Sequence, residues 1–463
     1  MPGSPVNTQR CTRVLPVDIS KLGKFVFQDP DLSFLGDWTI HLSEGSVDAA
    51  NLQEAASRLR SQDVPVAFPT ETVYGLGADA TRSSAVRGIY NAKQRPSDNP
   101  LIVHISSLAQ LRNLLSTRDE SGSIAGTDRD PIPDIYHPLI SRFWPGPLTI
   151  LLPLPAPSPL AAEVTTSLPT VAVRMPSSRL ALALIQLAGT PLAAPSANSS
   201  SRPSPTTAAH VLHDLSGRID LILDGGPCEV GVESTVVDGL ANPPVILRPG
   251  DVSLDMLRHV TGWEDVTIAY KDGAEEAAPR APGMKYKHYS PDARVLLFHG
   301  DMDANTTRKY LQTARTVGLL TTERWKPEVL QARPPCGDKY GVLSTSGRVS
   351  RDNESRSQVK ETADASETVV EAIGEPSVES ISPVQHSRIH LGGEDEFSID
   401  VWTIALGPDT KSIARGLFSA LRELDQKSVE VIFVEGIDDG KGGGARAAIM
   451  NRLRKAAELE IIL

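Results

Sequence analysis

Apolar side chains recur along this chain with two different spacings, which alternate from segment to segment. Some segments space them by three and four residues, as an amphipathic helix does, and the segments between are short apolar runs bounded by glycine or proline, as buried strands are. The helical period predicts helices at residues 45–61, 106–115, 178–188, 207–215, 303–314, 410–426 and 445–458. The apolar runs predict strands at residues 64–68, 101–105, 148–154, 170–176, 221–226, 234–239, 244–250, 293–299, 316–322, 400–406 and 429–436. Because several strands follow one another directly, the pattern predicts an α/β fold with an open, mixed, twisted sheet rather than a purely parallel one.

The same pattern divides the chain into parts. Residues 1–43 precede the alternation as an N-terminal extension, residues 44–266 carry a first α/β domain, and residues 267–292 are expected to form a polar linker. Residues 293–463 carry a second, smaller α/β domain of Rossmann-like character. Within it, residues from about 341 to 396 contain no aromatic side chain and many Ser, Glu and Asp. That composition is typical of a disordered insert, whose simplest role is that of a tether.

Composition excludes several classes of protein. Of the 463 residues, 40% are hydrophobic, which is enough for real cores, and the net charge of -11 excludes a generally basic surface for nucleic acid. Only three cysteines occur, none in a CxxC pair, which argues for a reducing compartment and against a zinc ribbon or a disulfide scaffold. No apolar run reaches the roughly 18 residues of a membrane helix, so no membrane span is expected.

The first residues bear on localisation. They carry Arg10, Arg13 and Lys21 but no apolar core of a secretory signal, so we expect no secretion. The same few basic residues make a weak case for a transit peptide. We therefore expect a cytoplasmic protein and leave a mitochondrial pool open.

Several catalytic motifs are absent from the sequence. There is no GxxxxGK[ST] phosphate loop, no HExxH, no GxSxG and no His/Cys spacing for a metal, so we expect no metal site in the protein. Gly440, Gly442 and Ala445 belong to a glycine-rich run between an expected strand and an expected helix. Such a run is weak evidence for a nucleotide site, and a tight turn is the better interpretation of it.

One stretch, residues 68–104, gathers polar side chains between strand-like and helix-like segments. Glycine and proline punctuate it, so Thr72, Lys93, Arg95 and Asn99 are expected on loops at strand ends. Two cations separated by one residue, beside hydroxyls and an amide, suit a polyanion. The alternative is a solvated helix end that carries Lys and Arg.

Further loops carry groups typical of phosphate and carboxylate sites. Arg174 ends an alternating strand and can bind a small carboxylate with two parallel hydrogen bonds. Ser196 and Ser204 offer hydroxyl donors beside helix N-termini, where phosphates bind well. Ser234 and Arg248 also lie at strand ends. Each alone could be an ordinary surface residue, but their shared placement is a signal, because open α/β sheets bind ligands outside strand ends.

The order of these motifs carries a family resemblance. FPTETVYGLG, KQRPSDNPLIVH, FWPGPLT, TVAVRMP, APSAN, RPSPT, GVESTVVD and ILRPG resemble the YrdC family of threonylcarbamoyl-AMP synthases. APGMKYKHYSP, followed by a second α/β domain, is similar to the two-domain form of that enzyme. The resemblance spans about residues 45–340 and 397–463, and it implies a YrdC-type open mixed sheet in the first domain.

The resemblance also implies a reaction. L-Threonine, bicarbonate and ATP give L-threonylcarbamoyl-adenylate and pyrophosphate, and the adenylate serves the threonylcarbamoyladenosine modification of tRNA next to the anticodon. A separate tRNA threonylcarbamoyltransferase complex would receive the product, and weak contact with tRNA itself stays open. Mg²⁺ is expected to accompany ATP, although no carboxylate is obviously committed to it.

The family's functional positions fall on particular residues of this chain. The threonine-binding positions that the resemblance implies are Thr72, His104, Arg174, Ala194 and Ser234. The ATP-binding positions that it implies are Arg95, Asn99, Thr170, Ser196, Ser204, Arg248 and Tyr289. Lys93 and Arg95 correspond to the family's pair of cations and are implied in catalysis, with the lysine on the phosphates.

The linker is our candidate for a lid. It concentrates Lys285, Lys287 and Tyr289 in a few residues, and a closed lid would protect a carbamate from water. A plain tether is the alternative.

Two other functions compete with a threonylcarbamoyl-AMP synthase. A carbamoyltransferase of the hydrogenase-maturation type would carry CxxC zinc fingers and an acylphosphatase-like segment, and this chain has neither. A non-catalytic RNA-binding or translation-initiation protein fits the acidic composition less well.

Overall fold

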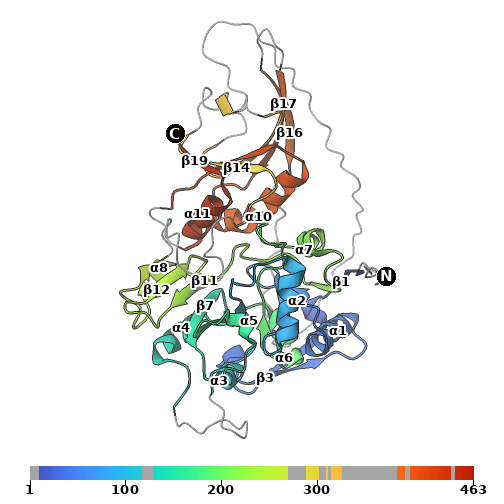
Figure 1. Ribbon diagram of the computed structural model, residues 1–463, viewed down its shortest axis with the longest axis vertical. Coiled ribbons are helices and arrows are strands. Elements are labelled where there is room, and N and C mark those ends of the chain that lie inside the picture. The colour runs from blue at the N-terminus through green and yellow to red at the C-terminus, as the bar shows by residue number, and fades with distance from the viewer. Residues whose placement is uncertain are drawn as a thin grey trace, which may run out of the picture.

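The structure is a computed structural model, and it describes residues 10–116, 129–269, 288–301, 309–310, 314–325, 383–391, 397–439 and 444–463. Figure 1 shows two lobes along the long axis, the first half of the chain in the lower lobe and the C-terminal part in the upper one. The described ranges include no helix that is long and apolar enough to cross a bilayer. Lys285, Lys287 and most of the helix expected at 303–314 lie outside the described residues.

The first lobe is built on an 11-stranded sheet that mixes parallel and antiparallel neighbours. Its strands, in spatial order, are β1 (Arg13–Pro16), β10 (Leu221–Asp224), β4 (Val66–Phe68), β5 (Gly75–Asp79), β9 (Leu192–Ala193), β6 (Ile102–His104), β8 (Thr170–Arg174), β7 (Leu148–Pro153), β11 (Thr235–Asp238), β12 (Val245–Arg248) and β13 (Thr267–Ile268). The predicted open mixed sheet is therefore confirmed. Because neighbours in space are distant in sequence, strand ends from many parts of the chain meet.

Helices cover this sheet, and several of them begin at a capping Ser or Thr. They are α1 (Val47–Ser61), α2 (Ser83–Lys93), α3 (Leu108–Leu115), α4 (His137–Phe143), α5 (Ala162–Thr165), α6 (Arg179–Ala188), α7 (Ala208–Leu215) and α8 (Leu254–Arg258), with short 3-10 turns η1 (Ile19–Lys21), η2 (Ser33–Leu35) and η3 (Asp134–Tyr136). Ser46, Ser107, Ser178 and Thr207 each accept a hydrogen bond from a first-turn amide of the helix that they cap. Since Thr207 caps α7, the hydroxyl of Ser204 is left to another partner.

The N-terminal extension is not separate from the first lobe, which corrects the boundary drawn at residue 43. β1 pairs in parallel with β10 at the edge of the large sheet. β2 (Gly23–Phe27) and β3 (Trp38–Leu42) form an antiparallel hairpin, whose Phe25 and Trp38 rings pack with Phe34. Trp38 Nε1 donates to the Ser106 carbonyl at 2.9 Å, so the hairpin closes over the core of the lobe.

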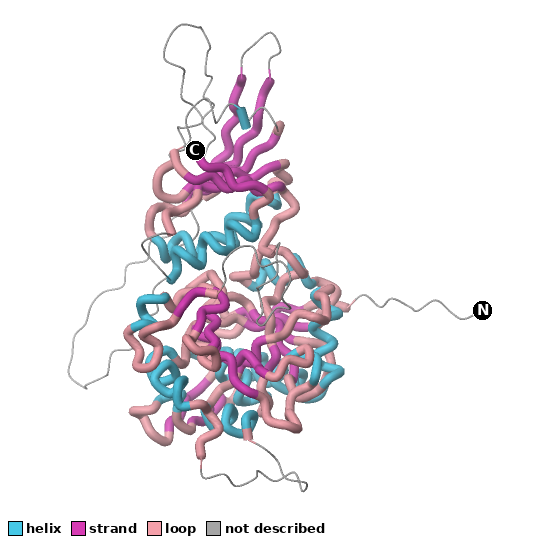
Figure 2. The backbone as a smooth tube through the Cα atoms, turned by 60° about the vertical axis from the view of Figure 1, so that its left-hand side comes forward, coloured by secondary structure: helices cyan, strands magenta, loops and turns pink. Residues whose placement is uncertain are grey.

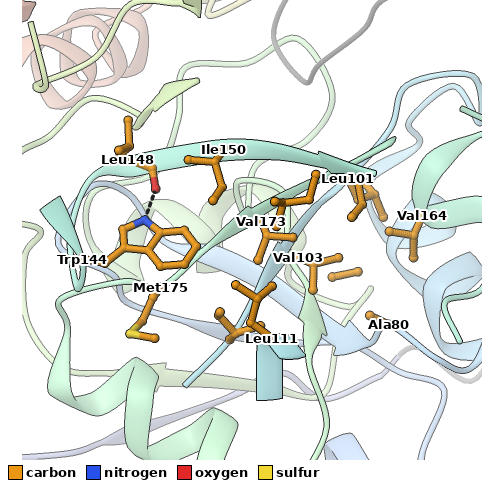
Figure 3. Packing of buried hydrophobic residues seen from close by; sticks show 14 of the residues in the cluster. Ala80, Leu101, Val103, Leu111, Trp144, Leu148, Ile150, Val164, Val173 and Met175 are labelled. Atoms are coloured by element: carbon orange, nitrogen blue, oxygen red, sulfur yellow. Dashed lines mark hydrogen bonds between the residues drawn. The ribbon is translucent and has the colours of Figure 1, made fainter. Parts of the chain in front are cut away.

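A continuous apolar core lies under the central strands. Figure 3 shows Ile150 and Val173 from neighbouring strands packed toward Val103, with Trp144 beside them. Trp144 Nε1 donates to the carbonyl of Leu148 at 2.7 Å, so the buried indole has its hydrogen-bond partner. This packing fixes β6 and β8, whose ends carry expected site residues, beside β7.

The second lobe is a six-stranded sheet in the order β16-β17-β15-β18-β14-β19. Its elements are β14 (Arg294–His299), β15 (Thr316–Thr321), β16 (Gln385–Leu391), β17 (Phe397–Ala405), α10 (Thr410–Gln426), β18 (Val431–Glu435), α11 (Gly444–Ala456) and β19 (Leu459–Ile462). All neighbours are parallel except β16 and β17. Figures 1 and 2 show α10 and α11 between this sheet and the first lobe.

The insert expected at 341–396 is too long at its C-terminal end. Residues 385–391 form β16, which pairs with β17 over its whole length. Residues 341–382 and 392–396 lie outside the described residues. The whole segment is polar in composition, and QHSRIHL has only two apolar residues, Ile389 and Leu391, so its apolar pattern does not mark it as a strand.

Candidate active site

A hollow of about 750 Å³, part of it open to solvent, lies where several strands of the first lobe end. This hollow, called the chamber from here on, lies beside the ends of β4, β6, β8, β9 and β12. The sequence-predicted residues that line it are Thr72, Lys93, Arg95, His104, Arg174, Ala194, Ser196, Ser234, Arg248 and Tyr289.

Arg174 is held rigidly in one wall of the chamber. It is 4% exposed, its Nε donates to the Gly146 carbonyl at 3.2 Å, and its Nη1 donates to Thr72 Oγ1 at 2.8 Å. Nη2 lies 2.5 Å from Glu71 Oε1, but without hydrogen-bonding geometry, so this contact is an ion pair. The planar guanidinium keeps further N–H groups for a ligand.

Glu71 is a residue that sequence reasoning missed. It is 6% exposed and supplies the buried negative charge beside Arg174. An uncompensated buried charge is costly, so the pair keeps this wall electrically balanced. The available signal was an acidic residue between two threonines in the motif FPTET.

His104 is a neutral imidazole with a defined hydrogen-bonding role. Burial, followed by the nearby Arg174 charge, lowers the pKa of His104 to about 3. Its Nδ1 lies 3.3 Å from the Ile102 carbonyl oxygen. Since a carbonyl only accepts, Nδ1 must carry the proton, which leaves Nε2 as an acceptor. A hydroxyl or amine of a ligand can therefore donate to His104.

Ser234 and Arg248 form a second polar group in the wall. Ser234 Oγ lies 2.8 Å from Thr149 Oγ1, and Arg248 donates to both the hydroxyl and the carbonyl of Ser234 at 3.1 Å. Burial lowers the pKa of Arg248 to about 10, so the side chain stays cationic at neutral pH. Thr149 is a further residue that sequence reasoning did not assign.

Lys93 and Arg95 differ in what their cations face. Lys93 is 1% exposed, and its Nζ donates to the carbonyls of Ser196 and Asn198, the latter at 2.6 Å. Burial, then the neighbouring Arg95 charge, lowers the pKa of Lys93 well below its usual range. Lys93 thus fastens the loop of residues 196–198, so its nitrogen is committed to the protein.

Arg95 keeps more of its donors for a ligand. Nη2 donates to the Pro100 carbonyl at 3.3 Å, and Nε has no hydrogen-bond partner although it is buried. Burial lowers the pKa of Arg95 to about 10, which still leaves a positive charge at neutral pH. An unpaired, buried guanidinium N–H favours an anionic ligand in the chamber.

Tyr289 brings the linker to the chamber. The residue is 5% exposed, its ring lies 5.2 Å from that of Phe418, and burial raises its pKa to about 12. The next residue, Ser290, donates its backbone N–H to the Ser201 carbonyl at 2.9 Å. The described end of the linker therefore lies against a chamber loop.

Three sequence-predicted residues do not line the chamber. Thr170 begins β8, whereas Arg174 ends it, and Thr170 lies in a separate hollow with Leu240. Asn99 is 2% exposed and receives a hydrogen bond from Tyr90 on its carbonyl at 3.1 Å. Ser204 is fully buried behind the wall and donates to Glu233.

No protein site for a metal ion appears in the described ranges. These residues include no group of three or more His, Cys, Asp or Glu side chains placed to hold one. Glu233, the acidic side chain among the lining residues, already accepts from Ser204 and from Arg452.

Family models match both lobes of the chain. A model for Sua5, YciO and YrdC proteins, described as "Telomere recombination", matches residues 58–250. A model described as "Threonylcarbamoyl-AMP synthase, C-terminal domain" matches residues 252–458. The two matches are adjacent and cover nearly all of the described chain.

Individual relatives match over most or all of their length. The threonylcarbamoyl-AMP synthase of Schizosaccharomyces pombe is 43% identical, with 88% of this chain and 88% of that protein covered. The Bacillus subtilis protein of that name is 39% identical, with coverage of 92% and 98%. The solved structure of Pyrococcus abyssi Sua5 complexed with L-threonine matches with a TM-score of 0.65 at 32% identity, covering 98% of this chain and 100% of that one. This chain therefore belongs to the threonylcarbamoyl-AMP synthase family.

Proposed function

We propose that this chain condenses L-threonine, bicarbonate and ATP into L-threonylcarbamoyl-adenylate and pyrophosphate, for the threonylcarbamoyladenosine modification of tRNA. One observation carries the proposal. A single chamber contains a carboxylate-type site at Arg174, a neutral acceptor at His104 and two further cations at Arg95 and Arg248. An amino acid and a triphosphate need these two kinds of site side by side.

The amino acid would bind to Arg174 and His104. The free N–H groups of Arg174 can hold the threonine carboxylate through charge-assisted hydrogen bonds. His104 Nε2 can accept from the threonine hydroxyl or amine, and because its pKa is about 3 it brings no positive charge near the amine. Threonine differs from serine by one methyl group, which is worth roughly 1–3 kcal/mol, so discrimination against serine should be modest.

The chemistry then needs charge neutralisation more than a protein nucleophile. Bicarbonate takes up a proton and loses water to give CO2, and the uncharged amine attacks its carbon, forming the C–N bond of a carbamate and releasing a proton. A carbamate oxygen attacks the α-phosphorus of ATP, and the bond from this phosphorus to the bridging oxygen breaks, so pyrophosphate leaves. Arg95 and Arg248 can stabilise the charge on the phosphates in this step.

The other expected positions that line the chamber support these sites. Thr72 and Ser234 hold Arg174 and Arg248 in place through their hydroxyls. Ser196 and Ala194 line the same chamber, and Lys93 fastens the loop that carries Ser196. The Mg²⁺ expected with ATP would arrive on the phosphates, since the described residues offer it no cluster of carboxylates.

The product would leave for another enzyme. A mixed anhydride of a carbamate and a phosphate reacts with water, so we propose that a tRNA threonylcarbamoyltransferase complex consumes it soon after release. We place this step in the cytoplasm, in keeping with the absence of paired cysteines. Tyr289 and the linker would close the chamber against water while the carbamate exists.

The direct test is product formation by the full-length chain. The protein is incubated with ATP, Mg²⁺, ¹³C-labelled bicarbonate and each amino acid in turn, and the products are identified by mass. Threonine should give a carbamoyl-adenylate that carries the ¹³C label together with an equal amount of pyrophosphate. Pyrophosphate release without a labelled adenylate, or equal rates with every amino acid, would contradict the proposal.

A further inference from the structure

One side chain of the second lobe reaches the wall of the chamber. Arg452 belongs to α11, is 0% exposed, and crosses the interface between the lobes. Its Nε donates to Glu233 Oε2 at 2.9 Å, and its Nη2 donates to the Glu233 carbonyl at 3.4 Å. Glu233 itself lines the chamber. The guanidinium therefore binds both the carboxylate and the backbone carbonyl of Glu233.

The same guanidinium touches two more elements of the site. Nη1 donates to the carbonyl of Pro249 at 2.5 Å, directly after Arg248. The Arg452 guanidinium carbon lies 5.8 Å from the centre of the Tyr289 ring, which is the distance of a cation–π contact. Arg452 thus joins the loop that holds Glu233, the turn after β12 and the end of the linker.

The carboxylate of Glu233 connects Arg452 to Ser204. Its Oε1 accepts from the Ser204 hydroxyl while its Oε2 accepts from Arg452, so both oxygens have partners. Burial alone would raise the pKa of Glu233, but the charges of Arg452 and Arg248 and the Ser204 hydrogen bond outweigh it and hold that pKa below its usual range. A carboxylate kept ionised in this way can only accept, which fixes the direction of both hydrogen bonds.

We propose that Arg452 is a positioning residue for the ATP side of the chamber, acting through Glu233 on Ser204 and through Pro249 on Arg248. This inference rests on the proposed function, because it assumes that Arg248 and Tyr289 contact ATP. Docking of the second lobe then completes the nucleotide site, and the threonine side around Arg174 does not depend on it. The guanidinium is suited to this task because it forms several hydrogen bonds in one plane.

The interface offers a matched control. Arg422 of α10 is 5% exposed and pairs with Asp214 at 2.8 Å and 3.0 Å, so it is also a buried cation that joins the lobes. Asp214 does not line the chamber. Arg422 also donates to the carbonyl of Pro203. Replacing Arg422 by Met weakens docking of the lobes but leaves the hydrogen bonds of Arg452 to Glu233 and Pro249 in place. A purely structural role for Arg452 would make the two substitutions equivalent.

The experiment compares R452M, R452K and R422M in the full-length chain, with unfolding curves to establish that each variant folds. R452M should raise the KM for ATP by roughly 10- to 100-fold, which is the effect of losing an outer-shell hydrogen-bond partner at metal sites. It should change the KM for threonine by less than about twofold. R452K keeps the charge but cannot bridge Glu233 and Pro249 together, so it should recover part of the effect. R422M should lower stability yet leave the KM for ATP within about twofold.

A double-substitution cycle tests the route. Because Arg452 and Ser204 act through the same carboxylate, R452M combined with S204A should raise the KM for ATP by less than the product of the two single effects. A KM for ATP that R452M leaves unchanged, or raises no more than R422M does, would overturn the inference, and so would fully multiplicative effects. A wild-type chain that forms no threonylcarbamoyl-adenylate would instead refute the proposed function.

Discussion

Replacing Arg174 by alanine should remove both activity and stability, and the structure gives the size of each loss. Two charge-assisted hydrogen bonds to a carboxylate are worth about 1.5–3 kcal/mol each. Their loss lowers kcat/KM for threonine by about 10²–10⁴-fold, at 1.36 kcal/mol for each factor of ten. The same change leaves Glu71 without its cation inside the protein, where it is 6% exposed. Removing one partner of a buried ion pair costs about 3–5 kcal/mol of stability.

A double substitution separates the two losses. R174M combined with E71L replaces the buried ion pair with apolar side chains, which is often neutral or stabilising. The double variant should therefore unfold at nearly the wild-type denaturant concentration, while threonine-dependent pyrophosphate release stays abolished. Denaturant unfolding followed by circular dichroism and a coupled pyrophosphate assay measure the two quantities. Recovery of threonine turnover in the double variant, or full stability of R174A, would refute the reasoning.

Three further predictions concern His104, the insert and the second lobe. The pKa of His104 is about 3 in the folded chain against an ordinary 6.5, so the unfolded chain binds the proton first as the pH falls. The free energy of unfolding should therefore drop by up to about 1.4 kcal/mol per pH unit between pH 6.5 and 3. In denaturant unfolding between pH 7 and 5, the free energy of unfolding of H104N should change less with pH than that of the wild type. A slope equal to that of wild type would contradict the buried neutral imidazole. Deleting residues 341–382 should leave turnover nearly intact, whereas extending the deletion to 396 removes β16 and should lower the unfolding temperature. Truncation after Pro282 removes Tyr289 and Arg452 together and should sharply weaken ATP use in steady-state assays; normal kinetics would exclude a role for the linker and the second lobe.

The positions that end strands could be predicted from the sequence. Thr72, His104 and Arg174 follow apolar runs, and a mixed sheet brings such ends to one region. Glu71 and Arg452 could not be predicted in this way, since their importance arises from burial against partners that are distant in sequence.

The errors in the element assignments have a similar cause. The sequence pattern does not place residues 23–42 in the first domain, because their aromatic residues are scattered and only the fold brings Phe25, Phe34 and Trp38 together. The composition of a long polar segment hides β16, because the first four residues of this strand are all polar. The family resemblance places Lys93 on the phosphates, and in this structure its nitrogen donates to the loop of residues 196–198.

The pairing of β1 with β10 delays the folding of the sheet during synthesis. Thr12 donates to the carbonyl of Ile219, 207 residues later, and β10 lies between β1 and β4 in the sheet. At roughly 5–20 residues per second, a ribosome needs about 10–40 s to make the partner of β1. During that time β1 and one edge of β4 have no neighbour, and unpaired edges are templates for aggregation. The first lobe therefore depends on protection of these nascent edges for as long as β10 is missing.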